Sequence, residues 1–430
     1  MLKEPRLGLL LALLFAASMW FYVQRVLVPY QKADAAVHGR PRGNLSDLYP
    51  RWLGARELLL HHRNPYSAQV TREIQTGYYG RPLDPDRADD PRFDEPKDQQ
   101  GFAYPVLVVF LLAPTVGLPF PVVQAGFCWL LVILTLASVL LWLQVLRWRP
   151  SATVTTILIV LTFGSYAVVQ GIKLQQLTLV VSALLAGCAG ALVAGYFSLA
   201  GFLLALATVK PQLTLPIAGW LILWALSDWG RRQIFFWSFA LTAAIFFAAS
   251  EYVLPGWVGQ FRDAVAAYRQ YTGGAGSLLD VLATPTLGKI LAAVVVIAVA
   301  VTGWRARFAS HDSVAFSTMF VLVLVATLVI VPSFAPYNQV LLLPAVFLIV
   351  ASWKELWGRN RLTRMACGLA VLVVFWPWLA AFGLMLASHF LPASSVQRAW
   401  AMPLYSSLGM PLVVLGLFGV CANDRLKAAT

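Results

Sequence analysis

The sequence predicts an all-α polytopic membrane protein of about 12 transmembrane helices with a long first outer loop. Of its 430 residues, 59% are hydrophobic and 12% are charged, whereas soluble domains carry roughly a quarter charged residues. Apolar runs recur along the chain, and one long charged stretch separates the first run from the others. A soluble fold could not bury this much apolar surface, so the bilayer must be the solvent for most of it.

A transmembrane helix needs about 20 mostly apolar residues, and roughly 11 to 13 segments come near that length. The candidates are 7–28, 104–118, 122–146, 152–170, 175–195, 196–209, 211–228, 233–253, 287–304, 313–332, 337–353, 365–388 and 405–422. The first follows Lys3 and Arg6 and resembles a signal peptide. Because so many spans follow it, we expect an uncleaved signal anchor.

The net charge of +13 lies in the membrane part of the chain. Residues 29–103 contain 11 basic and 11 acidic residues, so the rest holds 21 of the 32 basic residues and 8 of the 19 acidic ones. Short basic loops are typical of the cytoplasmic side of a membrane protein. No basic patch lies on a soluble domain, which argues against a nucleic-acid partner.

The basic clusters predict the orientation. Those expected in the cytoplasm are Lys3 and Arg6, Arg147 and Arg149, Arg231 and Arg232, Arg305 and Arg307, Lys354 to Arg364, and Arg425 and Lys427. Residues 29–103 are then outside, which requires an odd number of spans between that loop and Arg147. The two candidates there, 104–118 and 122–146, make an even number. Either 104–118 is a re-entrant or interfacial segment, or Arg147 and Arg149 are outside.

We expect one domain over residues 1–430, with a second long outer loop at 254–286. Within the first loop, the apolar residues of 47–62 recur near helical spacing, with charged residues between them. Pro50 suits the first turn of a helix. This pattern predicts an amphipathic helix on the membrane surface. Residues 81–98 are rich in charge and proline, so we expect a mobile insert there.

Asp47 is the candidate general base. It closes the linker after the first span and precedes the surface helix, which would hold a carboxylate where a lipid-borne hydroxyl could reach it. The alternative is an aspartate that caps the helix N-terminus.

Lys210 lies inside the apolar run LAGFLLALATVKPQLTLP. A lysine at bilayer depth is costly and indicates a functional site. The alternative is a lysine that snorkels from a helix end, because Pro211 ends the preceding helix. Gln212, Gln175 and Gln176 could complete a polar cavity or could satisfy helix ends.

Other motifs are weak. Asp84-Pro85-Asp86 matches the DxD pattern of nucleotide-sugar transferases but lies in the charged insert. His61 and His62 are adjacent and cannot both face one metal from a helix. The four cysteines are far apart in apolar runs. We therefore expect no metal site and no cofactor.

Five segments carry a resemblance to a known family. They are DLYPRWLGARELLLHHRNPYS, which includes Asp47 and the Asn64-Pro65-Tyr66 turn; GFAYPVLVVF, with Tyr104 and Pro105; LQQLTLVVSALLAG, with Gln176; the segment of Lys210; and SFAPYNQVLLLP, with Tyr337 and Asn338. In this order they resemble glycosyltransferase family 87 of the GT-C superfamily. The chain departs from the family pattern at Val106, at Gln175 in place of glycine, and at Tyr337 to Gln339, where histidine is frequent.

The resemblance implies a GT-C-like multi-spanning inverting glycosyltransferase (hexosyltransferase). Its donor would be a polyprenyl-phosphate sugar, typically mannose, its acceptor a lipid or glycan, and its active site would face the outside of the cell membrane. Asp47 maps onto the catalytic aspartate of the first outer loop. The expected donor-phosphate or substrate-binding residues are Lys210, Arg51, Arg56, Tyr66, Tyr104, Gln176, Gln212, Tyr337 and Asn338.

Two other classes of protein are alternatives to an enzyme. A transporter or lipid flippase would predict inverted repeats and paired broken helices, which the sequence does not show. A non-catalytic partner in envelope assembly would not need the Asp47 position.

Overall fold

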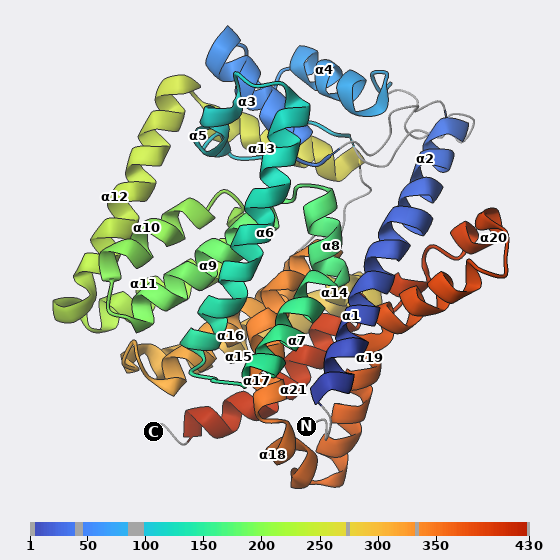
Figure 1. Ribbon diagram of the computed structural model, residues 1–430. Helices are drawn as coiled ribbons and strands as arrows, with labels where there is room; N and C mark the ends of the chain where they lie inside the picture. The colour runs from blue at the N-terminus through green and yellow to red at the C-terminus, as the bar shows by residue number, and fades with distance from the viewer. Residues whose placement is uncertain (1–4, 39–45, 85–98, 272–275, 332–334, 428–430) are drawn as a thin grey trace.

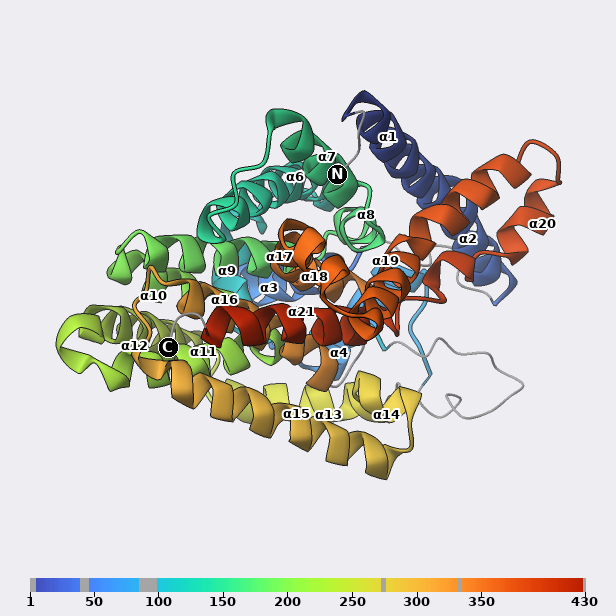
Figure 2. The same cartoon turned by 90° about the horizontal axis from the view of Figure 1, so that it is seen from below.

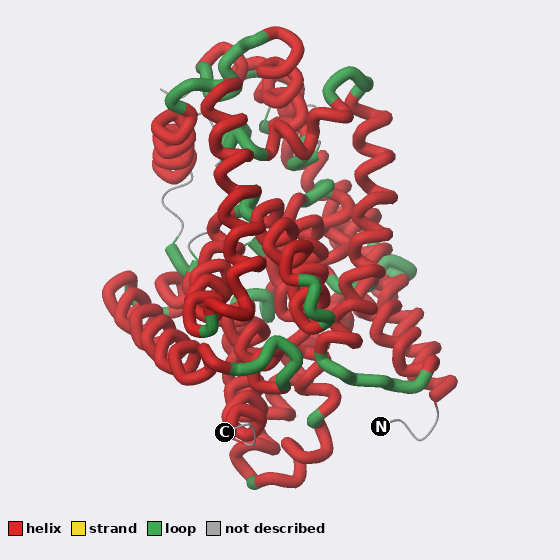
Figure 3. Tube along the Cα trace, turned by 90° about the vertical axis from the view of Figure 1, so that its left-hand side faces the viewer, coloured by secondary structure: helices red, strands yellow, loops and turns green. Residues whose placement is uncertain are grey.

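The computed structural model describes residues 5–38, 46–84, 99–271, 276–331 and 335–427 (Figure 1). The described residues form helices joined by loops and turns, without strands (Figure 3). This confirms the all-helical class. Residues 85–98, which hold most of the expected mobile insert, lie outside the described ranges.

The first part of the chain runs from the N-terminal apolar helix through the first loop into the helical bundle. Its elements are α1 (Pro5–Phe21), the π-helix η1 (Tyr22–Leu27), α2 (Val28–Val37), α3 (Tyr49–His61), α4 (Ala68–Tyr79), α5 (Val108–Leu112), the 3-10 turn η3 (Ala113–Thr115), α6 (Phe120–Val145), α7 (Ala152–Phe163), α8 (Tyr166–Lys173) and α9 (Leu177–Val193).

The remaining elements complete the bundle. They are α10 (Phe197–Ala207), α11 (Pro211–Ser227), α12 (Trp229–Val253), α13 (Trp257–Tyr271), α14 (Leu278–Leu282), α15 (Pro285–Arg305), η4 (Ala306–Phe308), α16 (Val314–Ile330), η5 (Pro336–Leu342), α17 (Leu343–Ala351), α18 (Trp353–Arg359), α19 (Arg361–Ala387), α20 (Ala393–Arg398), η6 (Met402–Leu404) and α21 (Met410–Lys427).

Five helices in the described ranges are long and apolar enough to cross a membrane, or up to seven if each bent pair counts as one span. The bent pairs are α7 with α8, at 53°, and η5–α17 with α18, at 65°. Four further apolar helices, α9, α10, α11 and α16, have only 11 to 17 residues. The structure therefore supports a multi-pass membrane protein, and the figure of 12 spans stays a prediction.

The segment 104–118 is not a full-length helix. It contains the five-residue α5 and the turn η3, and a five-residue helix extends only about 7.5 Å at 1.5 Å per residue. This segment is therefore too short to be a spanning helix, and of the two candidates only α6 separates the first loop from Arg147. One span is the odd number that the basic clusters require.

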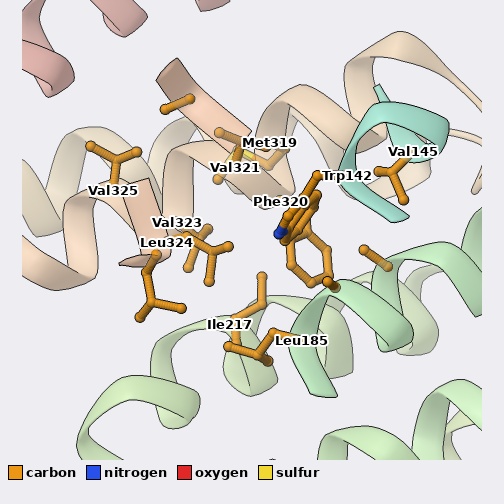
Figure 4. Close-up of a cluster of buried hydrophobic side chains, with 14 of the residues drawn as sticks. Trp142, Val145, Leu185, Ile217, Met319, Phe320, Val321, Val323, Leu324 and Val325 are labelled. Carbon is orange, nitrogen blue, oxygen red and sulfur yellow. The ribbon is translucent and has the colours of Figure 1, made fainter. Parts of the chain in front are cut away.

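The bundle has an apolar centre and an apolar rim. Trp142 of α6, Leu185 of α9, Ile217 of α11 and Phe320 of α16 meet at the centre (Figure 4). Helices α9 and α16 are buried on nearly every side, as expected for helices that are apolar all round. In contrast, α12 and α15 lie at the edge of the bundle (Figure 2), and most of their apolar side chains are exposed. Exposed apolar helix faces of this size suit contact with lipid.

The first loop packs as a folded cap on one end of the bundle. In Figure 1, α3, α4, α5 and α13 lie at the end opposite to α18 and both termini. Trp52, Ala55 and Leu58 of α3 are buried against Phe102 and its neighbours. Gly54 allows the close approach, because a Cβ there would lie 2.2 Å from the Phe102 ring. The predicted helix at 47–62 is confirmed as α3; its position at a membrane surface stays a prediction.

Candidate functional site

Asp47 is held on the turn between α8 and α9. Its backbone N–H donates to the carbonyl of Leu174 at 3.0 Å, and the neighbouring Ser46 hydroxyl donates to Gln175 Oε1 at 2.6 Å. These bonds join residues that are about 130 positions apart in the chain. The first loop is thereby attached to the helical bundle at Asp47 itself.

The carboxylate of Asp47 does not cap α3. The N-cap residue of α3 is Leu48, and no side chain caps that helix. Instead, the Asp47 carboxylate accepts a hydrogen bond from the Gln176 side-chain amide. The capping alternative is therefore wrong for this residue, because its side chain is turned toward the α8–α9 turn.

Gln176 connects Asp47 to Lys210. The amide oxygen of Gln176 accepts from Lys210 Nζ at 3.1 Å, while its amide nitrogen donates to Asp47. Lys210 Nζ also donates to Thr178 Oγ1 at 2.6 Å, and Thr178 donates to Asn338 Oδ1 at 2.9 Å. A continuous polar chain thus runs from the first loop through α9 and α11 to η5.

Lys210 is buried and does not snorkel. Only 3% of its surface is exposed, and it sits at the N-cap of α11, where Pro211 begins the helix as expected. Its Nζ lies 5.8 Å from the Tyr104 ring centre and 5.2 Å from that of Tyr337. Two aromatic faces and two hydrogen-bond acceptors compensate the buried charge.

Tyr104 joins a second cation to the cluster. The guanidinium of Arg51 lies 4.5 Å above the Tyr104 ring, and Arg51 Nη1 donates to the backbone carbonyl of Asp47 at 2.6 Å. Tyr66 holds Tyr104 from behind, because its hydroxyl donates to the Tyr104 carbonyl at 2.6 Å. Tyr66 therefore supports the cluster through the backbone of Tyr104.

The α8–α9 turn itself is conformationally special. Gln175 has a φ of 49°, a left-handed conformation that favours glycine. Its side chain is fully engaged: Nε2 donates to the carbonyls of Ile172 and Lys173, both at 2.7 Å, and Oε1 accepts from Gln124 at 3.1 Å. These bonds stabilise a non-glycine residue where the resemblance expected glycine.

Two of the expected residues lie apart from the cluster. Arg56 donates to the carbonyl of Val116 at 2.7 Å and lies 5.6 Å from the Trp52 ring, so it belongs to the packing of α3 on η3. Gln212 is exposed in the first turn of α11. Asp84 is described, whereas Asp86 of the DxD match is not. Over the residues that the structure describes, no group of three or more His, Cys, Asp or Glu side chains could hold a metal ion.

Two residues of the site escaped the sequence reasoning. Thr178 is fully buried and bonds both Lys210 and Asn338, but a threonine in an apolar helix carries no signal of its own. Lys173 ends α8 beside the Asp47 anchor. The sequence signal that could have found Lys173 is its position three residues before Gln176, which matches the family pattern.

The surroundings of Asp47 act on the pKa of its carboxyl in two directions. Burial raises the pKa of the Asp47 carboxyl above its usual value. The charges of Arg51 and Lys210, the hydrogen bond from Gln176 and the charge of Lys173 act in the opposite direction on that pKa. A carboxylate with a raised pKa accepts a proton more readily than an exposed one, which suits a general base.

Comparison with known proteins adds one finding. The model of the family described as Glycosyltransferase family 87 matches residues 102–332, which is more than half of the 430 residues. The match contains Tyr104, Gln176, Thr178 and Lys210, and Asp47 reaches it through the contacts above. No curated protein and no solved structure matches the chain.

Proposed function

The chain belongs to glycosyltransferase family 87, and from this membership and the Asp47 cluster we propose a transfer of mannose from a polyprenyl-phosphate donor to a lipid or glycan acceptor. The family shows that the protein is a glycosyltransferase and, with the apolar helices, a multi-pass membrane protein. It favours an enzyme over a transporter or a non-catalytic partner. The observation that carries the finer proposal is the hydrogen-bonded chain from Asp47 through Gln176 to the buried Lys210.

In the proposed reaction, Asp47 takes the proton of an acceptor hydroxyl. The hydroxyl oxygen forms a bond to the anomeric carbon of the donor sugar. The bond from that carbon to the phosphate oxygen breaks, and polyprenyl phosphate leaves with the bonding electrons. Because base and leaving group lie on opposite faces of the sugar, the anomeric configuration inverts.

The cations of the site would stabilise the departing phosphate. Lys210, which is buried, and Arg51, which is half-buried, lie next to Asp47, and fixed charges in such surroundings act more strongly than in water. Tyr104, Tyr337 and Asn338 would border the sugar. A phosphate already attached to lipid needs only such cations to leave, so the proposal includes no metal and no cofactor.

The donor is tested with the purified protein in lipid nanodiscs. A polyprenyl-phosphate mannose should support transfer to a membrane lipid or glycan acceptor, and GDP-mannose should not. The product sugar should have the anomeric configuration opposite to that of the donor, as measured by NMR. Efficient use of the nucleotide sugar would contradict the proposal and would return attention to Asp84 and Asp86.

The proposal also places the site on the extracytoplasmic side of the cell membrane. Arg72 of α4 and Arg231, in the first turn of α12, are both exposed, and α4 lies at the end of the molecule opposite to both termini (Figure 1). Single cysteines at these positions should react with an impermeant maleimide from opposite sides of the membrane. Arg72→Cys should react from outside the cell, and Arg231→Cys from the cytoplasmic side. The parent protein is the control, since Cys188, Cys367 and Cys421 are buried and Cys128 is half-buried. Labelling of both variants from the same side would contradict the orientation.

A further inference from the structure

The cations closest to Asp47 are already committed to protein partners. Lys210 is enclosed by Gln176, Thr178 and two tyrosine rings. Arg51 bonds the Asp47 carbonyl and stacks on Tyr104. Only 3% of the Lys210 surface is exposed, so a phosphate that contacted its Nζ directly would have to displace these partners. A more exposed basic residue beside the cluster can make that contact without displacing them.

Lys173 has both the position and the hydrogen-bond donors for that contact. It is the last residue of α8, and the next residue, Leu174, accepts the backbone hydrogen bond of Asp47 at 3.0 Å. Its side chain is half-buried, and its Nζ donates to Gln31 Oε1 at 3.1 Å. An ammonium group has three hydrogen-bond donors. Among the residues that the structure describes, Gln31 takes one of them, which leaves two for phosphate oxygens.

A second lysine lies beside it at the end of the first span. Lys32 is exposed and follows Gln31 on α2, the residue whose side chain accepts the hydrogen bond of Lys173. Helix α2 continues the apolar helix that runs over Arg6–Val37. The phosphate of a lipid whose tail lies along this helix would thus reach Lys32 and Lys173 where the span ends.

The charges of the site match such a ligand. Among the described residues of the cluster, three basic residues, Arg51, Lys210 and Lys173, accompany the one carboxyl group of Asp47. This excess of basic groups suits a departing phosphate monoester, which carries about −1.5 to −2 at pH 7. A neutral sugar or a transported neutral lipid would leave this excess uncompensated.

We infer that Lys173, assisted by Lys32, binds the phosphate of the isoprenoid donor between α8 and α2 and so sets the anomeric carbon beside Asp47. This assignment rests on the proposed function for the identity of the ligand. It differs from that proposal in naming the residue that touches the phosphate. The lipid tail then lies against α1 and α2.

Binding without transfer tests this assignment. The probe is farnesyl phosphate, with farnesol, phosphatidic acid and inorganic phosphate as comparison ligands, titrated into the full-length protein in nanodiscs of neutral lipid. Wild type should bind farnesyl phosphate more tightly than each of the three. Lys173→Gln should weaken that binding roughly tenfold or more, the usual effect of one charge-assisted contact. Lys173→Arg should restore most of it, and Lys289→Gln, at an exposed lysine of α15, should leave it unchanged.

Each outcome bears on a different statement. Equal binding by wild type and Lys173→Gln would overturn the role of Lys173 while leaving the donor class intact. Equal binding of farnesyl phosphate and farnesol by wild type would overturn the donor class itself. Equal binding of phosphatidic acid would show a general lipid-phosphate site and would contradict the isoprenoid assignment. Should Lys173→Gln fail to fold, Lys32→Gln, at an exposed position, provides the test, with a roughly threefold loss expected and no loss contradicting the site.

Discussion

Asp47→Asn is expected to slow sugar transfer by about 10²–10⁴-fold, the usual effect of losing a general base. Asparagine keeps the size of the side chain and can still accept the hydrogen bond from Gln176 through its amide oxygen. It cannot accept a proton from the acceptor hydroxyl. The measurement is the initial rate of transfer from the lipid-linked donor in nanodiscs, together with the melting temperature, which should change little.

The matched control for Asp47→Asn is Asp263→Asn. Asp263 lies on α13, at the same end of the bundle, and its side chain is 76% exposed beside Arg262. This variant removes the same charge at the same end of the molecule and should retain the wild-type rate. A wild-type rate for Asp47→Asn would remove the assignment of the base.

Lys210→Met is expected to have the second-largest effect, a fall of roughly tenfold or more in kcat/KM for the donor. Methionine has a similar length but no charge, so the attraction for the departing phosphate is lost. The amide oxygen of Gln176 and the hydroxyl of Thr178 also lose their donor. Initial rates over a range of donor concentrations measure the fall.

Thr178→Val separates the charge of Lys210 from its hydrogen bonds. This variant removes the bonds from Lys210 and to Asn338 but keeps the ammonium. The loss of kcat/KM should therefore be smaller for Thr178→Val than for Lys210→Met. An unchanged kcat/KM for Lys210→Met would make Lys210 a structural residue only.

The sequence identified the site residues whose cost is visible locally. A lysine within an apolar run is costly and therefore conspicuous, and Lys210 is buried in the structure. Pro211 indicated where the next helix begins, and α11 begins there. Asp47 was marked by its place before the predicted surface helix. Its hydrogen bond with Gln176 connects it to the rest of the site. This bond joins positions separated by 129 residues, and no local pattern encodes such a pairing. Thr178 and Lys173 enter the site only through this tertiary arrangement.

The fold was predictable to the level of its class. Composition and apolar runs gave the right class because every span must satisfy its backbone internally. The sequence left the segment 104–118 open between a span and a re-entrant or interfacial segment, since its hydrophobicity serves the packing of α5 under α3. The same run of apolar residues suits a buried protein core and a bilayer. Length therefore separated spans from core helices poorly for segments such as α9 and α16, which are 17 residues long.

The pH dependence of single-turnover transfer by wild type and Asp47→Asn tests the central role of Asp47 most directly. A base must be deprotonated, so the wild-type rate should fall as the pH decreases through the pKa of Asp47. Burial raises that pKa, so the fall should begin above the range of an ordinary aspartate, about 3.9. Asp47→Asn should show a low rate without this acid limb. An acid limb at the same pH in both proteins would show that another group is the base.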